Sequence, residues 1–208
     1  MPEYRHEHVF YTRKEWCEVD YFVKVVQFLS EKKIESFLDI GSNVGEVANI
    51  LFEKIHSIQN FYLVEPQKDN FLFLKQNTQQ IKNCSYYDVG IYYGKKKSEL
   101  FQDPSWKNVG AFTIEIIQKQ FKSTGEKIVL KTLEELNLPI VDFVKIDVEG
   151  SEYNILENSS YLKNVKYVEI EFHDWSINNF DFIQKNIPSH KITIYDQNIS
   201  SHLLLEKI

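Results

Sequence analysis

Three apolar stretches of the chain, residues 37–40, 61–64 and 141–146, have an acidic residue at or near their carboxyl ends that could bind a ligand. The acidic residues are Asp39, Glu65 and Asp147, and the first stretch continues into a loop with glycine at both ends, Gly41 to Gly45. In an open α/β sheet, ligands bind at the carboxyl ends of the strands. Acidic strand ends in this order, the first with a glycine loop, predict a site for a nucleoside-type cofactor.

The glycine loop favours a small anionic group over a chain of phosphates. Gly41 allows a tight turn, Gly45 allows the following helix to approach the strand, and the N-terminus of that helix offers backbone donors. Asn43 replaces the middle glycine of a dinucleotide fingerprint, and no Gly-Lys-Ser/Thr ending follows, so a P-loop is excluded. The loop therefore suits a ligand that carries a carboxylate.

Two further acidic residues fit the remainder of a nucleoside. Glu65 lies 20 residues after Gly45 and can accept two hydrogen bonds from a ribose diol, as in dinucleotide folds. Asp88 can accept from an adenine amino group, with backbone contacts from Val89. The alternatives stay open here: Glu65 could be an exposed glutamate at a strand end, and Asp88 an acidic loop residue.

Ionisable residues occupy alternate positions in two later stretches: Lys145, Asp147 and Glu149, and then Glu169, Glu171 and His173. Alternate positions along a strand share one face. If the two strands pair in parallel, both rows meet at the crevice. Buried carboxylates are costly without a cation, which Lys145 can supply. We expect a functional cluster rather than a row facing solvent, because strands of a parallel sheet are covered on both faces.

The elements that must position these residues alternate between strand and helix. Apolar runs predict strands over 36–40, 60–64, 84–89, 142–148 and 165–172, a short extended piece over 128–131, and a terminal hairpin over 192–195 and 202–205. Helical spacing predicts helices over 12–33, 46–56, 69–79, 151–156 and 178–185. Asp69 or Asn70 is the expected cap of the third helix, and Thr132 with Glu135 predicts a capping box that opens a further helix. This alternation predicts a mostly parallel sheet with helices on both faces.

Composition is that of one globular domain spanning all 208 residues. Residues 1–35 are expected to form an N-terminal helical extension, and residues 90–127 an insertion beside the ligand-binding crevice. The net charge of −6 argues against nucleic acid as a partner. The two cysteines allow no disulfide framework, which fits a cytoplasmic location, and no run approaches the ~20 apolar residues of a membrane span. We interpret His56, His190 and His202 as surface or element-end residues.

Together these motifs resemble the FkbM family of S-adenosylmethionine-dependent methyltransferases. The resemblance covers about residues 36–174 and rests on the glycine loop, Glu65-Pro66, Lys145-Ile146-Asp147-Val148-Glu149-Gly150-Ser151-Glu152 and Glu169-Ile170-Glu171-Phe172-His173. The lysine-containing motif is the most specific of these. The family implies a Rossmann-like, seven-stranded class I methyltransferase sheet, mostly parallel, with helices on both faces and an antiparallel C-terminal hairpin.

The resemblance also implies a cofactor, a reaction and a set of site residues. The reaction is O-methylation of a hydroxyl on a sugar, glycan or polyketide-like small molecule. By motif position, the methionine part of the cofactor is held by Asp39, Gly41, Ser42, Asn43 and Gly45, the ribose by Glu65, the adenine by Asp88 and Val89, and the sulfonium lies beside Asp147.

The catalytic group expected from the sequence is His173 with Asp147, Glu149 and Lys145. His173 is the first candidate for the general base, because its ordinary pKa lies near neutral pH. A divalent metal held by Asp147, Glu149 and His173 is a less favoured alternative, so no metal ligand is assigned. Two other functions stay open: a catalytically inactive S-adenosylmethionine-binding protein, and a nicotinamide-dependent oxidoreductase.

Overall fold

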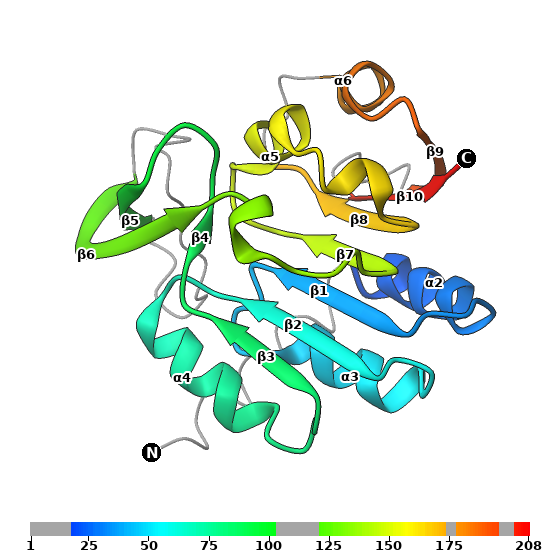
Figure 1. Ribbon diagram of the computed structural model, residues 1–208, viewed down its shortest axis with the longest axis horizontal. Coiled ribbons are helices and arrows are strands. Elements are labelled where there is room, and N and C mark those ends of the chain that lie inside the picture. Colours follow the sequence, from blue (N-terminus) through cyan, green and yellow to red (C-terminus); the bar gives the residue numbers. More distant parts are fainter. Residues whose placement is uncertain (1–17, 103–120, 174–177, 196–201) are drawn as a thin grey trace.

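A seven-stranded sheet forms the centre of the computed structural model, which describes residues 18–102, 121–173, 178–195 and 202–208 (Figure 1). Its strands are β1 (Ser36–Ile40), β2 (Asn60–Val64), β3 (Cys84–Tyr87), β7 (Phe143–Ile146), β8 (Tyr167–Glu171), β9 (His190–Tyr195) and β10 (His202–Lys207). Their order is β3-β2-β1-β7-β8-β10-β9. β10 runs antiparallel to both β8 and β9, and the other neighbours are parallel. The predicted fold class, including the C-terminal hairpin, is confirmed, and the strand order reverses direction between β1 and β7.

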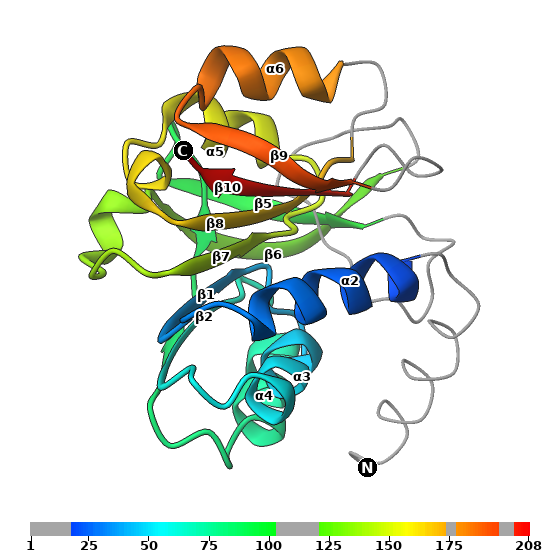
Figure 2. The ribbon, with the colours of Figure 1, turned by 90° about the vertical axis from the view of Figure 1, so that its right-hand side faces the viewer.

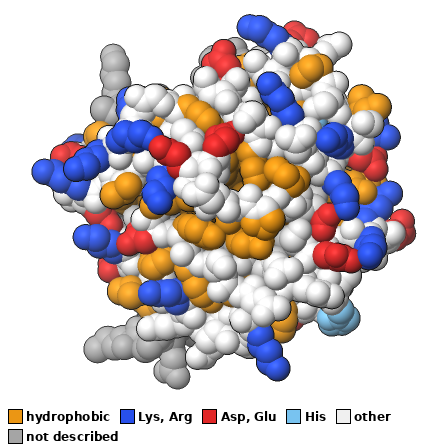
Figure 3. Space-filling view, in the orientation of Figure 1, with side chains coloured by type: hydrophobic (Ala, Val, Ile, Leu, Met, Phe, Trp, Pro, Cys, Tyr) orange, Lys and Arg blue, Asp and Glu red, His pale blue; other side chains and the backbone are white. Residues whose placement is uncertain are grey.

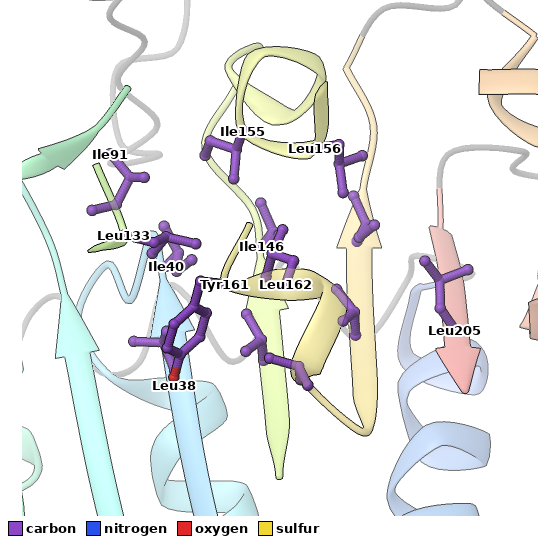
Figure 4. Packing of buried hydrophobic residues seen from close by; sticks show 14 of the residues in the cluster. Leu38, Ile40, Ile91, Leu133, Ile146, Ile155, Leu156, Tyr161, Leu162 and Leu205 are labelled. Carbon is purple, nitrogen blue, oxygen red and sulfur yellow. The ribbon is translucent and has the colours of Figure 1, made fainter. Parts of the chain in front are cut away.

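Helices cover both faces of this sheet (Figure 2). They are α2 (Glu18–Ser30), α3 (Glu46–Lys54), α4 (Lys68–Asn77), α5 (Glu152–Asn158) and α6 (Asn179–Asn186), with short 3₁₀ turns η1 (Glu134–Leu136) and η2 (Leu162–Asn164). One core joins α2, α3 and α4 to Phe37, Phe61 and Phe143 of the sheet. The other core joins α5, α6 and both 3₁₀ turns to the opposite face, where Ile155 and Leu156 lie over Ile146 (Figure 4). None of the described helices is both long and apolar enough to cross a membrane.

The two faces of the sheet differ at the carboxyl ends of the strands. On the face under α5, the side chains stay apolar to the strand end, as in Leu38 and Ile40 of β1. On the face under α2 and α3, the alternation brings Asp39 two residues after the core residue Phe37, and Lys145 two residues after Phe143. This face is therefore apolar along its middle and ionisable at its carboxyl edge.

The predicted insertion contributes a three-stranded arm beside the carboxyl edge (Figure 1). Its strands are β4 (Gly90–Ile91), β5 (Lys97–Gln102) and β6 (Lys122–Lys131), in the order β4-β6-β5; residues 103–120 lie outside the described part. The arm has its own small core of Leu100, Ile128 and Leu130. Basic side chains are spread over this face of the molecule, with acidic ones among them (Figure 3). The arm has five exposed lysines: Lys95, Lys96, Lys97, Lys122 and Lys127.

Two local predictions were wrong. The capping box is present, with the Thr132 N–H donating to Glu135 Oε2 at 2.9 Å and the Glu135 N–H donating to Thr132 Oγ1 at 3.3 Å. The helix it opens is only the 3₁₀ turn η1, because Asn137 takes a left-handed backbone with φ 52°. The cap of α4 is Gln67 rather than Asp69 or Asn70: its side chain accepts from the Asn70 N–H at 2.6 Å.

Candidate active site

The glycine loop is fastened to the ends of three central strands. The Gly41 and Ser42 N–H groups both donate to the Val64 carbonyl at 3.0 Å, and the Asp147 N–H donates to the Ile40 carbonyl at 3.0 Å. Gly41 has a φ of +86°, and a Cβ built on it would lie 1.7 Å from the Asp147 carbonyl oxygen. Only glycine fits there, and the close approach places the loop after β1 directly against the segment after β7.

Ser42 and Asn43 connect this loop to the end of β2. The Ser42 hydroxyl donates to the Asp39 carbonyl at 2.9 Å and accepts from the Val64 N–H at 3.0 Å, so it joins the two strands. The Asn43 N–H donates to Glu65 Oε2 at 2.9 Å, and the Gln67 N–H donates to Glu65 Oε1 at 2.9 Å. Glu65 is thus fixed beneath the loop, and each of its oxygens retains a further lone pair.

Burial determines the protonation of Glu65. It raises the pKa of the carboxyl to about 8, against the opposing effect of the two backbone N–H groups. Additional donors from a ligand would favour the charged form of the carboxylate. The predicted ribose-binding position therefore holds a buried carboxyl that hydroxyl donors would stabilise.

Asp39 is a buried carboxylate that the described residues leave without a hydrogen bond. It is 1% exposed, and neither of its oxygens has a hydrogen-bond partner within the described part of the chain. Burial raises its pKa to about 7, with Lys145 lowering it and Asp147 raising it further. A buried carboxylate of this kind fits a cationic donor supplied by a ligand.

The other predicted cofactor residues border the same edge. Gly45, with φ +89°, caps α3 and lies against α4, where a Cβ would meet Thr78 Cγ2 at 2.7 Å and Leu74 Cδ1 at 2.8 Å. Asp88 is exposed and Val89 is half-buried, directly after β3. Both lie next to the start of the arm, which begins with β4 at Gly90.

Lys145 is the buried cation of the predicted cluster. Its Nζ donates to Asp147 Oδ2 at 2.8 Å, and Glu169 is its neighbour in the register of β7 and β8. Burial alone would lower its pKa, but the charges of Asp147, Asp39 and Glu169 outweigh this and raise it. The lysine therefore stays charged and offsets part of the surrounding negative charge.

The structure brings His173 together with four carboxylates. Its Nδ1 lies 2.7 Å from Glu152 Oε1, and its Nε2 lies 3.2 Å from Glu149, 3.5 Å from Glu171 and 3.9 Å from Asp147. Burial acts to lower the pKa of the imidazole, but the hydrogen bond with Glu152 and the negative charges raise it to about 11. In this arrangement His173 is protonated at neutral pH, and the base role expected for it from its ordinary pKa is not supported.

The carboxylates around His173 are correspondingly hard to ionise. Burial is the main cause that raises the pKa of Glu149 to about 7 and that of Glu171 to about 8, and in both cases Asp147 adds to the effect while His173 opposes it. Glu149 also takes a left-handed backbone, with φ 54°. Several pKa values shifted in one place are typical of functional sites.

Two residues of this region were missed in the sequence. Glu152 is fully buried and orients His173; its place in the lysine-containing motif was the available signal. His202 is 6% exposed and lies 3.6 Å from Glu169 and 3.7 Å from Glu171; it is the first residue of β10, one of the two predicted alternatives, but it does not lie at the surface. His190 is also buried, with Nε2 2.8 Å from the Val165 carbonyl.

A comparison with family models places most of the chain in one known domain. The model of the methyltransferase FkbM domain matches residues 39–192. This stretch begins at Asp39 and contains the glycine loop, Glu65 and the whole cluster around His173. No curated protein matches the chain.

Solved structures resemble the chain in fold. A methyltransferase FkbM from Methylobacillus flagellatus KT superposes with a TM-score of 0.54 at 14% identity, over 85% of this chain and 44% of that one. A methyltransferase from Geobacter sulfurreducens superposes with a TM-score of 0.52 at 10% identity, over 88% of this chain and 75% of that one. Precorrin-6y C5,15-methyltransferase from Geobacter metallireducens GS-15 superposes with a TM-score of 0.50 at 10% identity, over 88% of this chain and 86% of that one. The chain spans less than half of the Methylobacillus protein, and these likenesses show the fold alone.

Proposed function

Because the chain belongs to the FkbM family of S-adenosylmethionine-dependent methyltransferases, we propose that it transfers a methyl group to a hydroxyl of a sugar, glycan or polyketide-like small molecule. The observation that carries this proposal is the Asp39 carboxylate, buried beside the glycine loop without a hydrogen bond from any described residue. The cofactor carries an ammonium and a sulfonium. A buried carboxylate without a hydrogen bond suits such a cation.

We assign the cofactor-binding residues as the motifs predict. Asp39 receives the ammonium, and Glu65 accepts from the ribose hydroxyls. The remaining contacts come from Gly41, Ser42, Asn43, Gly45, Asp88, Val89 and Asp147. The fixed position of Glu65 under the loop supports its role. The hydroxyl of Ser42 joins β1 to β2 and its N–H donates to the Val64 carbonyl, so the assignment of Ser42 rests on its position in the motif.

The catalytic end of the crevice lies where β7 and β8 end. When bound, S-adenosylmethionine supplies an electrophilic methyl group: the acceptor oxygen bonds to this carbon as the carbon–sulfur bond breaks and its electron pair stays on sulfur. The acceptor hydroxyl must lose its proton as this happens. Since His173 is held protonated, we infer that the proton passes to a carboxylate of the cluster, while Lys145 keeps Asp147 in position.

Calorimetric titration with S-adenosylmethionine, and separately with NADH, tests the cofactor. We expect S-adenosylmethionine alone to bind, and Glu65→Gln to weaken it about tenfold, the equivalent of about 1.4 kcal/mol. Glu157→Gln is the matched control, because it removes the same charge from an exposed position on α5. Equal affinities of the two variants would remove Glu65 from the site, and binding of NADH in place of S-adenosylmethionine would favour an oxidoreductase.

The acceptor class is tested by turnover. Incubation with S-adenosylmethionine and a panel of hydroxylated sugars, glycans and polyketide-like compounds should release S-adenosylhomocysteine and add one methyl ether to a member of the panel. Single-stranded RNA serves as the contrasting acceptor, because the acidic net charge disfavours it. Cofactor binding without turnover of any acceptor would favour an inactive S-adenosylmethionine-binding protein.

A further inference from the structure

Three metal-ligating side chains converge where β7 and β8 end. A carboxylate oxygen of Asp147, a carboxylate oxygen of Glu149 and a ring nitrogen of His173 all lie within 4.8 Å of one another. Asp147 and Glu149 come from the segment after β7, and His173 comes from the segment after β8. Two carboxylates with one imidazole are a donor set that divalent cations such as Mn²⁺ bind. The three side chains are half-buried.

Glu152 gives His173 the orientation of a metal ligand. It is fully buried, and its Oε1 lies 2.7 Å from His173 Nδ1 and accepts from the Gly150 N–H at 2.9 Å. Its other oxygen, Oε2, has no hydrogen-bond partner within the described residues. The contact turns His173 Nε2 toward Glu149 and Asp147. A carboxylate on the far ring nitrogen is the usual companion of a metal-bound histidine, because it fixes the ring and the tautomer.

The charges of the cluster leave room for a divalent cation. Four carboxylates, those of Asp147, Glu149, Glu152 and Glu171, lie within 3.9 Å of the His173 ring nitrogens. Lys145, bonded to Asp147, is a cation beside them. On binding a metal ion, His173 would lose its Nε2 proton and keep the Nδ1 proton on the side of Glu152. Partly buried carboxylates are costly, and a divalent ion would offset part of that cost.

We propose that Asp147, Glu149 and His173 bind one divalent cation, with Glu152 as the positioning residue for His173. The sequence alone did not favour this site, because it gave no sign that Glu152 reaches the far side of the imidazole. A cation here would polarise an acceptor hydroxyl and make its proton easier to remove. Glu171, which faces the same ring nitrogen at 3.5 Å, is then available to receive the proton. This catalytic role rests on the proposed methyl transfer, whereas the binding of the metal does not.

Binding of Mn²⁺, followed by electron paramagnetic resonance of the free ion after treatment with EDTA and dialysis, tests the site without any turnover. We expect one Mn²⁺ per chain, and an affinity at least about tenfold weaker in Glu149→Gln and in Asp147→Asn. Glu157→Gln, an exposed glutamate of the neighbouring helix α5, should bind Mn²⁺ as the wild type does. Urea midpoints of the variants show whether each is folded, and two independent ligand substitutions keep the test decisive if one is not.

Absence of Mn²⁺ binding to the folded wild type at about 1 mM, a concentration that detects even weak sites, would overturn the proposal. Equal affinity in Glu149→Gln and Glu157→Gln would overturn it too. His173 would then be a permanent imidazolium that serves only as a counter-ion. Titration with S-adenosylmethionine in EDTA separates the two proposals. Binding of the cofactor without binding of Mn²⁺ would refute the metal site and leave the proposed methyl transfer standing. Binding of Mn²⁺ without binding of the cofactor would refute the proposed methyl transfer.

Discussion

Replacement of Gly41 by alanine should destabilise the protein far more than the same change at Gly94. Both glycines have positive φ values, +86° and +96°, so each alanine carries the backbone cost of a left-handed residue, about 1–2 kcal/mol. At Gly94 nothing lies within 4 Å of the added Cβ. At Gly41 the Cβ would lie 1.7 Å from the Asp147 carbonyl oxygen, a backbone atom that cannot rotate away.

The steric contribution at Gly41 follows from this contact. The distance must open from 1.7 Å to at least 3.0 Å, which moves the end of β1 away from the segment after β7. Overpacking of this kind costs about 1–3 kcal/mol. The shift also strains the hydrogen bond from the Asp147 N–H to the Ile40 carbonyl, which contributes about 1 kcal/mol. We therefore expect Gly41→Ala to lower the free energy of unfolding by about 2–4 kcal/mol more than Gly94→Ala does.

Urea unfolding followed by far-ultraviolet circular dichroism measures the two free energies directly. Titration of each folded variant with S-adenosylmethionine adds a second readout, because displacement of Asp147 should weaken cofactor binding in Gly41→Ala and leave it unchanged in Gly94→Ala. Unfolding free energies that agree between the two variants would refute the reasoning. The loop after β1 would then not touch the segment after β7, and the geometry of the site would have to be redrawn.

Three further predictions concern pH and packing. The Glu134 carboxylate accepts from the Tyr93 hydroxyl and from backbone N–H groups after α5, and these bonds outweigh burial and lower its pKa to about 2. The free energy of unfolding should therefore fall as the pH drops from 4.5 toward 2. Urea titration at each pH should show a less steep fall in Glu134→Gln. Burial lowers the pKa of His190 below 6.5, so the unfolded state binds a proton more readily than the folded state does. The free energy of unfolding should therefore decline as the pH falls below 6.5, and His190→Asn should reduce this decline. Tyr161→Phe removes a hydroxyl that donates to the Pro139 carbonyl at 2.7 Å and should cost about 1–2 kcal/mol in the same assay; an unchanged midpoint would contradict that hydrogen bond.

Much of the sheet could be predicted from local sequence. β1 and β2 begin and end at the predicted residues, because each is a short apolar run bounded by polar residues or glycine. β6 was predicted only over residues 128–131, although it begins at Lys122. Its first half is exposed and polar, and it is a strand because β5 pairs with it. Pairing between distant segments leaves no local signal in such a stretch.

The positions of the site residues were predictable, but their charge states were not. Acidic strand ends and alternating rows are visible in the sequence, and the parallel sheet brings them together. The pKa of His173 depends instead on distances of 2.7 to 3.9 Å to four carboxylates, one of which, Glu152, comes from the first turn of α5. His202 was missed for a similar reason, since it is buried by the pairing of β10 with β8 and by Tyr21 of α2.

One face of the sheet is apolar and the other has an ionisable edge, so the positions of the site residues depend on the register of the strands. A slip of one residue in β8 would place Ile170 where Glu169 pairs with Lys145. The carboxylate of Glu169 would then lie on the apolar face under α5, and an apolar side chain would face Lys145. One slip would thus spoil a core and the crevice at once, so a misregistered chain could not persist as a stable but inactive protein. An insertion within β7 or β8 would shift the register in the same way and disturb the core and the ionisable edge together.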